Sequence, residues 1–243
     1  MKEQDSPGFF RTTHWSLVHR AVETESESAN QALEEICTAY WYPLYGFIRR
    51  QGHNVQDAED LTQGFFTKLL TKEILGAADR EKGHLRSFLL TCLRRYLSDQ
   101  RDRRFAEKRG SEVTFSLDTA LAEERYSAEP ASGDLPPDRL FQRRWAITLL
   151  EFSLNAIRLE FANRGKADLF AALRPFLGLG ETSAESYEVV ACRLGMPVGT
   201  FKSHVSRVRE RWREVLFEQV AMTLDEPTSD NIKAELAELK EWL

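Results

Sequence analysis

Two clusters of basic and hydroxyl side chains have the composition of surfaces that bind nucleic acid. The first lies in residues 187–216, where six basic residues stand against three acidic ones in a chain of net charge −5. Its basic members are Arg193, Lys202, Arg207, Arg209, Arg211 and Arg213. Guanidinium and ammonium groups bind phosphate oxygens, and hydroxyl groups contact phosphates or base edges. This local positive charge in an acidic protein predicts binding to DNA.

The same stretch has the hydrophobic pattern of two helices joined by a tight turn. The first helix is predicted to bury Val189, Val190 and Leu194. Gly195 and Pro197 interrupt the pattern, because glycine takes the left-handed turn that ends a helix and proline cannot continue one. The second helix is predicted to begin at Thr200, with its core stripe at three- and four-residue spacing in Phe201, Val205, Val208, Trp212 and Leu216. This is the pattern of a helix-turn-helix whose second helix enters the major groove. A solvated basic helix in an ordinary helical hairpin is the alternative.

The second basic cluster follows the strongest amphipathic helix of the chain, predicted from residue 85 to 104. Its core stripe consists of Leu85, Phe88, Leu89, Cys92, Leu93, Tyr96 and Leu97. Between residues 94 and 109 there are seven basic and three acidic residues. Favourable interaction of cations with a helix C-terminus explains two of these basic residues more easily than seven. The excess again indicates a phosphate-binding surface.

A helix predicted over residues 55–70 has a polar ridge opposite its apolar face. The ridge consists of Gln56, Asp60, Gln63 and Thr67, with Asp57 beside it. Asn54 and Asp57 are spaced as a helix N-terminal cap. Gly64 lies mid-helix, where glycine costs about 1 kcal/mol relative to alanine, so a neighbouring group is expected to approach closely there. His53, Asp57, Glu59 and Asp60 do not form a metal site in this interpretation, because Glu59 points away from Asp60 and no second histidine follows.

These patterns predict an all-α protein with two small helical domains joined by a flexible linker. The predicted order is an N-terminal leader (1–29), a first domain (30–105), an acidic linker with little apolar periodicity (106–137), a second domain (138–220) and an acidic helical tail (221–243). The tail carries Ile232, Leu236 and Leu239 at helical spacing and is interpreted as a cap on its domain or a handle for a partner.

Composition restricts the class of protein further. The three cysteines are far apart and form no CxxC pair, which favours buried thiols in a reducing compartment. No apolar run approaches the roughly 20 residues that span a bilayer, and the first residues lack a signal-peptide core, so a cytoplasmic location is expected. The sequence contains neither a phosphate-binding loop nor a nucleophile–base pair, so we expect no enzyme activity, no cofactor and no metal.

Three segments together resemble the extracytoplasmic-function group of bacterial RNA polymerase sigma factors. Residues 57–66 (DAEDLTQGFF) resemble the polymerase-docking helix of that family, and residues 85–104 resemble its promoter-melting helix. Residues 194–205 (LGMPVGTFKSHV) resemble its −35 reader. The resemblance covers about residues 30–105 and 140–218. Gly64 departs from the family pattern, which has an acidic or polar residue there, and the linker is longer than is typical.

The resemblance implies a role for each surface. Polymerase core would be bound by Gln56, Asp57, Asp60, Gln63 and Thr67. The −10 element would be bound and opened by Asp79, Arg80, Lys82, His84, Arg94, Arg95, Arg101, Arg103 and Arg104. The duplex −35 element would be contacted by Thr200, Lys202, Ser203, Ser206, Arg207, Arg209 and Arg213. The loop 79–84 would capture a base flipped out of the opened strand, and the acidic linker would lie in the polymerase cleft.

The resemblance thus implies a sigma factor with RNA polymerase core and promoter DNA as partners, and an anti-sigma factor or similar regulator as a further possible one. A stand-alone helix-turn-helix regulator with a helical sensor domain is the main alternative, and it would need a dimer for specificity. A helical enzyme using His53, Asp57 and Asp60 ranks far lower. An adaptor that binds only protein would leave both basic clusters unexplained.

Overall fold

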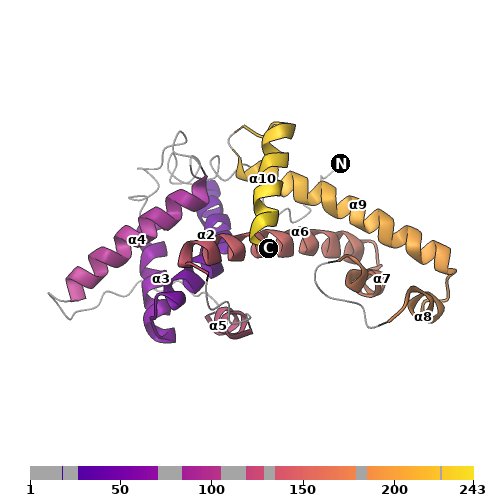
Figure 1. Cartoon of the computed structure of the whole chain (residues 1–243), viewed down its shortest axis with the longest axis horizontal. Helices are drawn as coiled ribbons and strands as arrows, with labels where there is room; N and C mark the ends of the chain where they lie inside the picture. The colour runs from indigo at the N-terminus through magenta and orange to yellow at the C-terminus, as the bar shows by residue number, and fades with distance from the viewer. Residues whose placement is uncertain are drawn as a thin grey trace. The chain divides into compact units, whose positions relative to one another are not determined.

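The computed structural model describes residues 18, 27–70, 84–104, 119–128, 135–178, 185–224 and 226–243, and all the regular secondary structure in these residues is helical (Figure 1). The all-α prediction is confirmed. None of the helices in these ranges is both long enough and apolar enough to cross a membrane. The predicted leader, 1–29, falls almost entirely outside the described residues, as does the loop 79–83.

The chain forms two compact units. One comprises Leu149–Gln219, and the other comprises the described residues of 10–148 together with Val220–Leu243. The division therefore falls inside helix α6 (Pro137–Asn163) and inside helix α9 (Val198–Thr223). The prediction assigned residues 138–148 to the second domain and residues 221–243 to a separate tail. In the structure, both segments belong to the same compact unit as the first helices of the chain.

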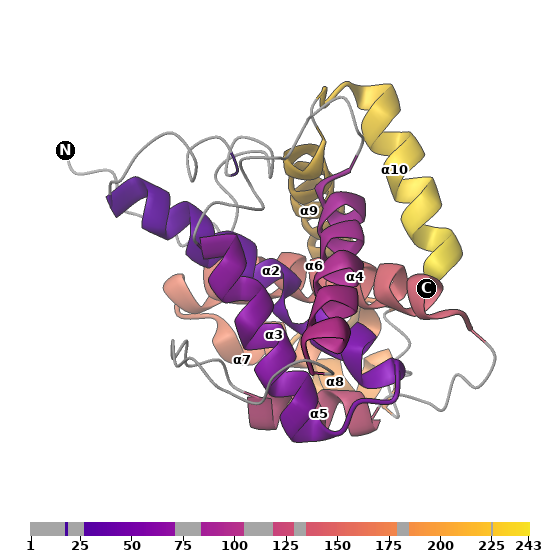
Figure 2. The same cartoon turned by 90° about the vertical axis from the view of Figure 1, so that its left-hand side faces the viewer.

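Three helices form the centre of the larger unit, which we call the α2–α4 unit: α2 (Glu27–Arg50), α3 (Val55–Leu70) and α4 (Leu85–Arg104) (Figure 2). Helix α2 continues through Pro43. Asn54 caps α3 as predicted: its Oδ1 accepts from the Asp57 backbone N–H at 2.8 Å, and its Nδ2 donates to Asp57 Oδ2 at 2.9 Å.

The Tyr96 side chain of α4 packs directly against Gly64 of α3. A Cβ atom placed on Gly64 would lie less than 3.0 Å from the Tyr96 hydroxyl oxygen of α4. Tyr96 also packs its ring against Phe65, with ring centroids 5.8 Å apart. The expected close approach at Gly64 is therefore confirmed, and the approaching group is a side chain of the protein itself. The glycine at this position therefore has a packing role.

Helix α5 (Thr119–Ala128) corrects the prediction of a flexible linker for these residues. Its Glu123 accepts hydrogen bonds from Tyr45 Oη at 2.6 Å and from Arg49 Nε and Nη2 at 2.9 and 2.8 Å. The Arg125 guanidinium lies 4.0 Å from the ring centroid of Tyr42. These partners all belong to α2. Acidic composition favours a solvated linker, but Glu123 of this segment is neutralised by Arg49, which is far away in the sequence.

Helix α10 (Ser229–Trp242) belongs to the same unit and begins at Thr228, whose hydroxyl accepts from the Asn231 N–H at 3.2 Å. Ile232 and Leu239 are buried as the predicted stripe requires, and Leu236 is half-buried. Glu235 is also buried, at 3% exposure, within the same stripe. Its partner is Arg86, near the N-terminus of α4, which is 2% exposed.

The smaller unit, which we call the α7–α9 unit, consists of the last part of α6, helix α7 (Ala167–Leu173), a 3-10 turn η3 (Arg174–Phe176), helix α8 (Tyr187–Arg193) and most of α9. Its core gathers residues from each of these elements, including Ile157, Phe170, Leu173, Val190 and Phe201. This unit contains the predicted helix-turn-helix.

Candidate nucleic-acid interface

The turn between α8 and α9 has the geometry that the sequence predicts. Gly195 has a φ of +64°, the left-handed conformation that favours glycine. The Gly195 N–H donates to the Cys192 carbonyl at 3.0 Å, and the Met196 N–H donates to the Ala191 carbonyl at 3.0 Å. These two bonds make a Schellman motif, which satisfies the last carbonyls of α8. Pro197 follows, and α9 begins at Val198, two residues before the predicted start.

An aromatic cluster fixes how α9 leaves this turn. Phe201 is fully buried, with its ring centroid 5.2 Å from that of Phe176 and 6.0 Å from that of Tyr187. Val205 and Val208 continue the buried stripe, whereas Trp212 and Leu216 are half-buried. The predicted burial of Val189 is wrong, because its side chain is 52% exposed and Val190 and Ala191 face the core instead. In a helix of two turns, only one narrow face is buried.

The predicted −35 residues at the start of α9 lie on its exposed side. Thr200, Lys202, Ser203, Ser206, Arg207 and Arg213 are all exposed. In the part of the chain that the structure describes, Arg207 and Arg213 have no ion-pair partner. Lys202 lies 3.9 Å from Glu188 and 5.4 Å from the Tyr187 ring centroid, and the Ser203 hydroxyl donates to the Gly199 carbonyl at 2.9 Å. This face offers cations and hydroxyls to a ligand.

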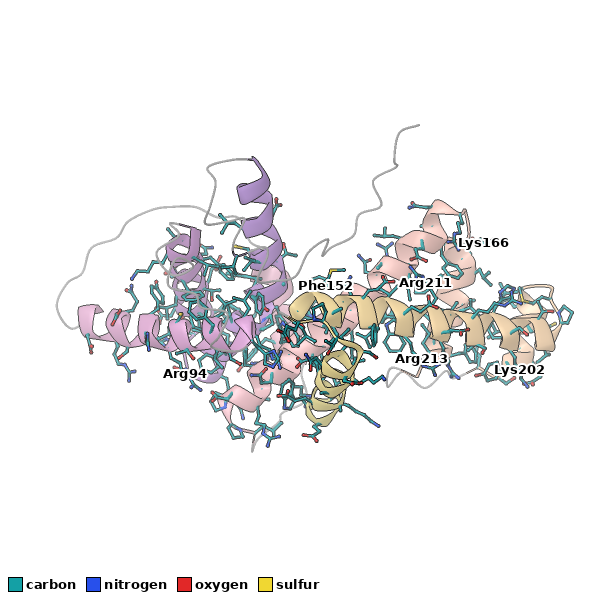
Figure 3. The ribbon with its side chains drawn as sticks, turned by 90° about the horizontal axis from the view of Figure 1, so that it is seen from above. Arg94, Phe152, Lys166, Lys202, Arg211 and Arg213 are labelled. Atoms are coloured by element: carbon teal, nitrogen blue, oxygen red, sulfur yellow. The ribbon has the colours of Figure 1, made fainter. Side chains whose placement is uncertain are left out.

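Two arginines of α9 have partners within the α7–α9 unit. Arg209, a predicted −35 residue, donates from Nε and Nη2 to the Phe176 carbonyl at 3.1 and 2.5 Å, which ties α9 to η3. Arg211 Nη2 donates to Glu160 Oε1 of α6 at 2.7 Å, and its Nη1 donates to Glu214 at 3.0 Å. The hydrogen bonds that Arg211 donates to these carboxylates raise its pKa. Arg211 and Arg213 lie on opposite sides of α9 (Figure 3).

The basic cluster of α4 is divided along the helix. Arg94 forms an ion pair with Asp138 of α6 and lies 5.7 Å from the Phe47 ring centroid. Further along, Arg95 and Arg101 are exposed, and neither has an ion-pair partner among the residues that the structure describes. Arg103 and Arg104 are helical residues whose side chains fall outside the described set, and so do Asp79, Arg80 and Lys82 entirely. The C-terminal half of α4 therefore presents the unpaired cations.

His84, immediately before α4, lies beside buried charges. Its Nε2 is 3.5 Å from Glu235 Oε2. Burial lowers the pKa of His84, and the Arg86 charge acts in the same direction, while Glu235 and Glu238 oppose this shift. His84, Glu235 and Glu238 place their ligand atoms within 4.8 Å of one another. The Arg86 guanidinium lies among them and already supplies the positive charge that a metal ion would bring.

The polar ridge of α3 is also on the surface. Gln56 and Asp60 are exposed, while Asp57, Gln63 and Thr67 are half-buried. The Asp57 carboxylate accepts from Nδ2 of the capping residue Asn54 at 2.9 Å, and Thr67 donates to the Gln63 carbonyl at 3.0 Å. Asp60 has no ion-pair partner in the described ranges. Asp60 is therefore the carboxylate of the ridge that is accessible to a cation of a binding partner.

Sequence reasoning did not identify Arg86 and Glu235. Each is a charged residue on an apolar helical stripe: Glu235 stands three residues after Ile232 and four before Leu239, and Arg86 stands four residues before Leu90 and seven before Leu93. Charges at core positions are buried only with a partner, so two such positions of opposite sign were the available signal.

Comparison with protein-family models, with curated proteins and with solved structures finds no match.

Proposed function

We propose that this protein is a sigma factor of the extracytoplasmic-function type, which binds RNA polymerase core and directs transcription initiation at specific promoters. The observation that carries the proposal is the α8–α9 helix-turn-helix. Its Schellman turn and the buried Phe201 hold the first turns of α9 with Thr200, Lys202 and Arg207 exposed. A helix presented in this way can enter the major groove and place cations near the flanking phosphates.

The α2–α4 unit supports the polymerase and −10 parts of the proposal. Asp60 stands exposed on α3, and Arg95 and Arg101 stand exposed on the C-terminal half of α4. In the proposed mechanism the α3 ridge binds a basic surface of the polymerase, and the α4 cations hold phosphates of the opened −10 strand. Binding energy drives strand opening, and each flipped base costs a few kcal/mol that contacts to its exposed edge repay.

Co-purification with bacterial RNA polymerase core tests the proposal. The full chain is expected to form a stoichiometric complex with core, and Asp60→Arg is expected to abolish it by placing like charges together. Glu124→Arg is the matched control, because it reverses one exposed carboxylate of the same unit on α5, away from the ridge. This control should keep the complex.

Two other results would contradict the proposal. Equal loss of the complex in both variants would show that general charge, and not the ridge, mediates binding. Absence of a complex, together with tight duplex binding by the free protein, would favour a stand-alone helix-turn-helix regulator.

A further inference from the structure

Helix α10 covers the N-terminal turn of α4, where the predicted −10 site begins. Arg86 of that turn is 2% exposed and Glu235 of α10 is 3% exposed. Arg86 Nη1 lies 2.6 Å from Glu235 Oε1, and its Nη2 lies 3.9 Å from Glu238 Oε2. The carboxylates of Glu235 and Glu238 in α10 thus both lie within ion-pair distance of the Arg86 guanidinium in α4.

The remaining contacts of Arg86 come mainly from α6. Its Nε donates to Gln142 Oε1 at 2.9 Å, and its guanidinium lies 4.6 Å from the Trp145 ring centroid. Trp242 of α10 lies on it as well, at 5.2 Å. If α10 moved away, Gln142 and Trp145 would still hold Arg86 in place. An oriented guanidinium beside an indole ring can bind a phosphate and an unpaired base, the two parts of a single-stranded nucleotide.

The contact between Arg86 and α10 is close but poorly directed. Glu235 Oε1 is buried and has no hydrogen-bond partner among the described residues, so the 2.6 Å contact with Arg86 is a charge pair without hydrogen-bond alignment. The Glu238 contact is near the limit of an ion pair. A buried pair repays its desolvation only when its geometry is good, so α10 is held less firmly than its burial alone would indicate.

His84 connects this contact to the proposed function. It is one of the residues expected to contact the opened −10 strand, and Glu235 lies 3.5 Å from it. Glu235 therefore faces both His84 and Arg86 from the position that a strand phosphate would take.

We propose that α10 is an internal competitor of single-stranded DNA, which occupies a binding site formed by His84, Arg86 and Trp145. This inference rests on the proposed function, since it identifies the site with the −10 strand. With α10 docked, Glu235 and Glu238 fill the site; when α10 is displaced, Arg86 binds a phosphate and Trp145 stacks on a base.

The test uses the full chain and a fluorescently labelled single-stranded DNA of random sequence, about 20 nucleotides long, in an anisotropy titration. Glu235→Gln removes the charge that faces Arg86 with little change of shape. Glu241→Gln is the matched control, because Glu241 is an exposed residue of the same helix. We expect Glu235→Gln to raise the affinity about tenfold, and Glu241→Gln to change it less than about twofold.

Hydrogen exchange on the same two variants measures the docking of α10 directly. In Glu235→Gln the amides of 229–242 should exchange about tenfold faster, while those of α2 and α3 keep their protection and show that the unit remains folded. Faster exchange without a gain in DNA affinity would overturn the proposed ligand. Unchanged exchange, or the same gain in affinity for both variants, would overturn the proposed competition.

Core co-purification of the wild type, run in parallel, separates the two proposals. A wild type that fails to bind core, with Glu235→Gln still gaining DNA affinity, would reject the sigma factor and leave the competition by α10 standing. If the wild type binds core, but Glu235→Gln changes neither the DNA affinity nor the exchange of the α10 amides, the sigma factor proposal would stand and the competition by α10 would be rejected.

Discussion

Helices α4 and α9 are both basic, but they divide their arginines in different ways. In α9 the division follows the distance from the buried stripe: Arg209 and Arg211, at the two edges of the stripe, bind protein acceptors, while Arg207 and Arg213 lie farther from it and are exposed. In α4 the division follows the length: Arg86 is buried at the N-terminal end, and Arg95 and Arg101 are exposed toward the C-terminal end. The number of basic residues in a sequence therefore does not give the positive charge that is accessible to a ligand.

The largest expected effect concerns the buried end of α4. Arg86→Met should weaken the packing of α10 on α4 by about 3 kcal/mol, because it leaves Glu235 buried without a cation. Native-state hydrogen exchange of the α10 amides measures this loss. Arg101→Met, at the exposed end, is the control and should change stability by less than about 0.5 kcal/mol. Similar losses of stability in the two variants would contradict the division of α4 into a buried N-terminal end and an exposed C-terminal end.

A smaller effect should separate the exposed arginines of α9 from those paired within the protein. Arg207→Ala should leave the free energy of unfolding unchanged and reduce the salt dependence of duplex DNA binding by about one unit of slope, since one phosphate contact is lost. Arg211→Ala should leave that slope unchanged and cost about 0.5–1 kcal/mol of stability, because its pair with Glu160 is partly exposed to solvent. Titrations at several salt concentrations and urea unfolding provide the two measurements. A stability loss in Arg207→Ala and a reduced salt dependence in Arg211→Ala would contradict this assignment of the two arginines.

The smallest effect is the pH dependence of α5 docking. Hydrogen bonds from Arg49 hold the pKa of Glu123 below its ordinary value of 4.5. A carboxyl with a lowered pKa in the folded state stabilises the fold above its unfolded pKa, and this contribution disappears as the pH falls through the folded value.

Comparison of the wild type with Glu123→Gln isolates this contribution. The wild type should be the more stable protein at neutral pH, and thermal unfolding should show the difference shrinking below pH 4.5. A difference that does not change with pH would mean that packing, and not the Arg49–Glu123 charge pair, holds α5 against α2.

Sequence patterns predicted the features that depend on near neighbours. The Schellman turn at Gly195, the Asn54 cap of α3 and the buried stripe of Phe201, Val205 and Val208 all formed as expected. Glycine at a left-handed position, a capping side chain and a helical hydrophobic period act over a few residues, so a sequence window contains their causes. The exposure of Arg207, which follows from the position of that stripe, was predictable for the same reason.

The tertiary structure alone decided which partners the remaining groups find. Acidic composition could not tell that Glu123 meets Arg49 or that Glu235 meets Arg86, because these pairs join residues 74 and 149 positions apart. Nor could spacing tell that Tyr96 fills the space at Gly64, or that the Phe176 carbonyl engages Arg209. Local causes in the sequence specify the start of α3, the turn before α9 and the buried stripe of α9, whereas they did not reveal α5 or the exposure of Val189. Folding decided which charges are neutralised inside the protein and which remain for a ligand, because that depends on which side chains the packed helices bring together.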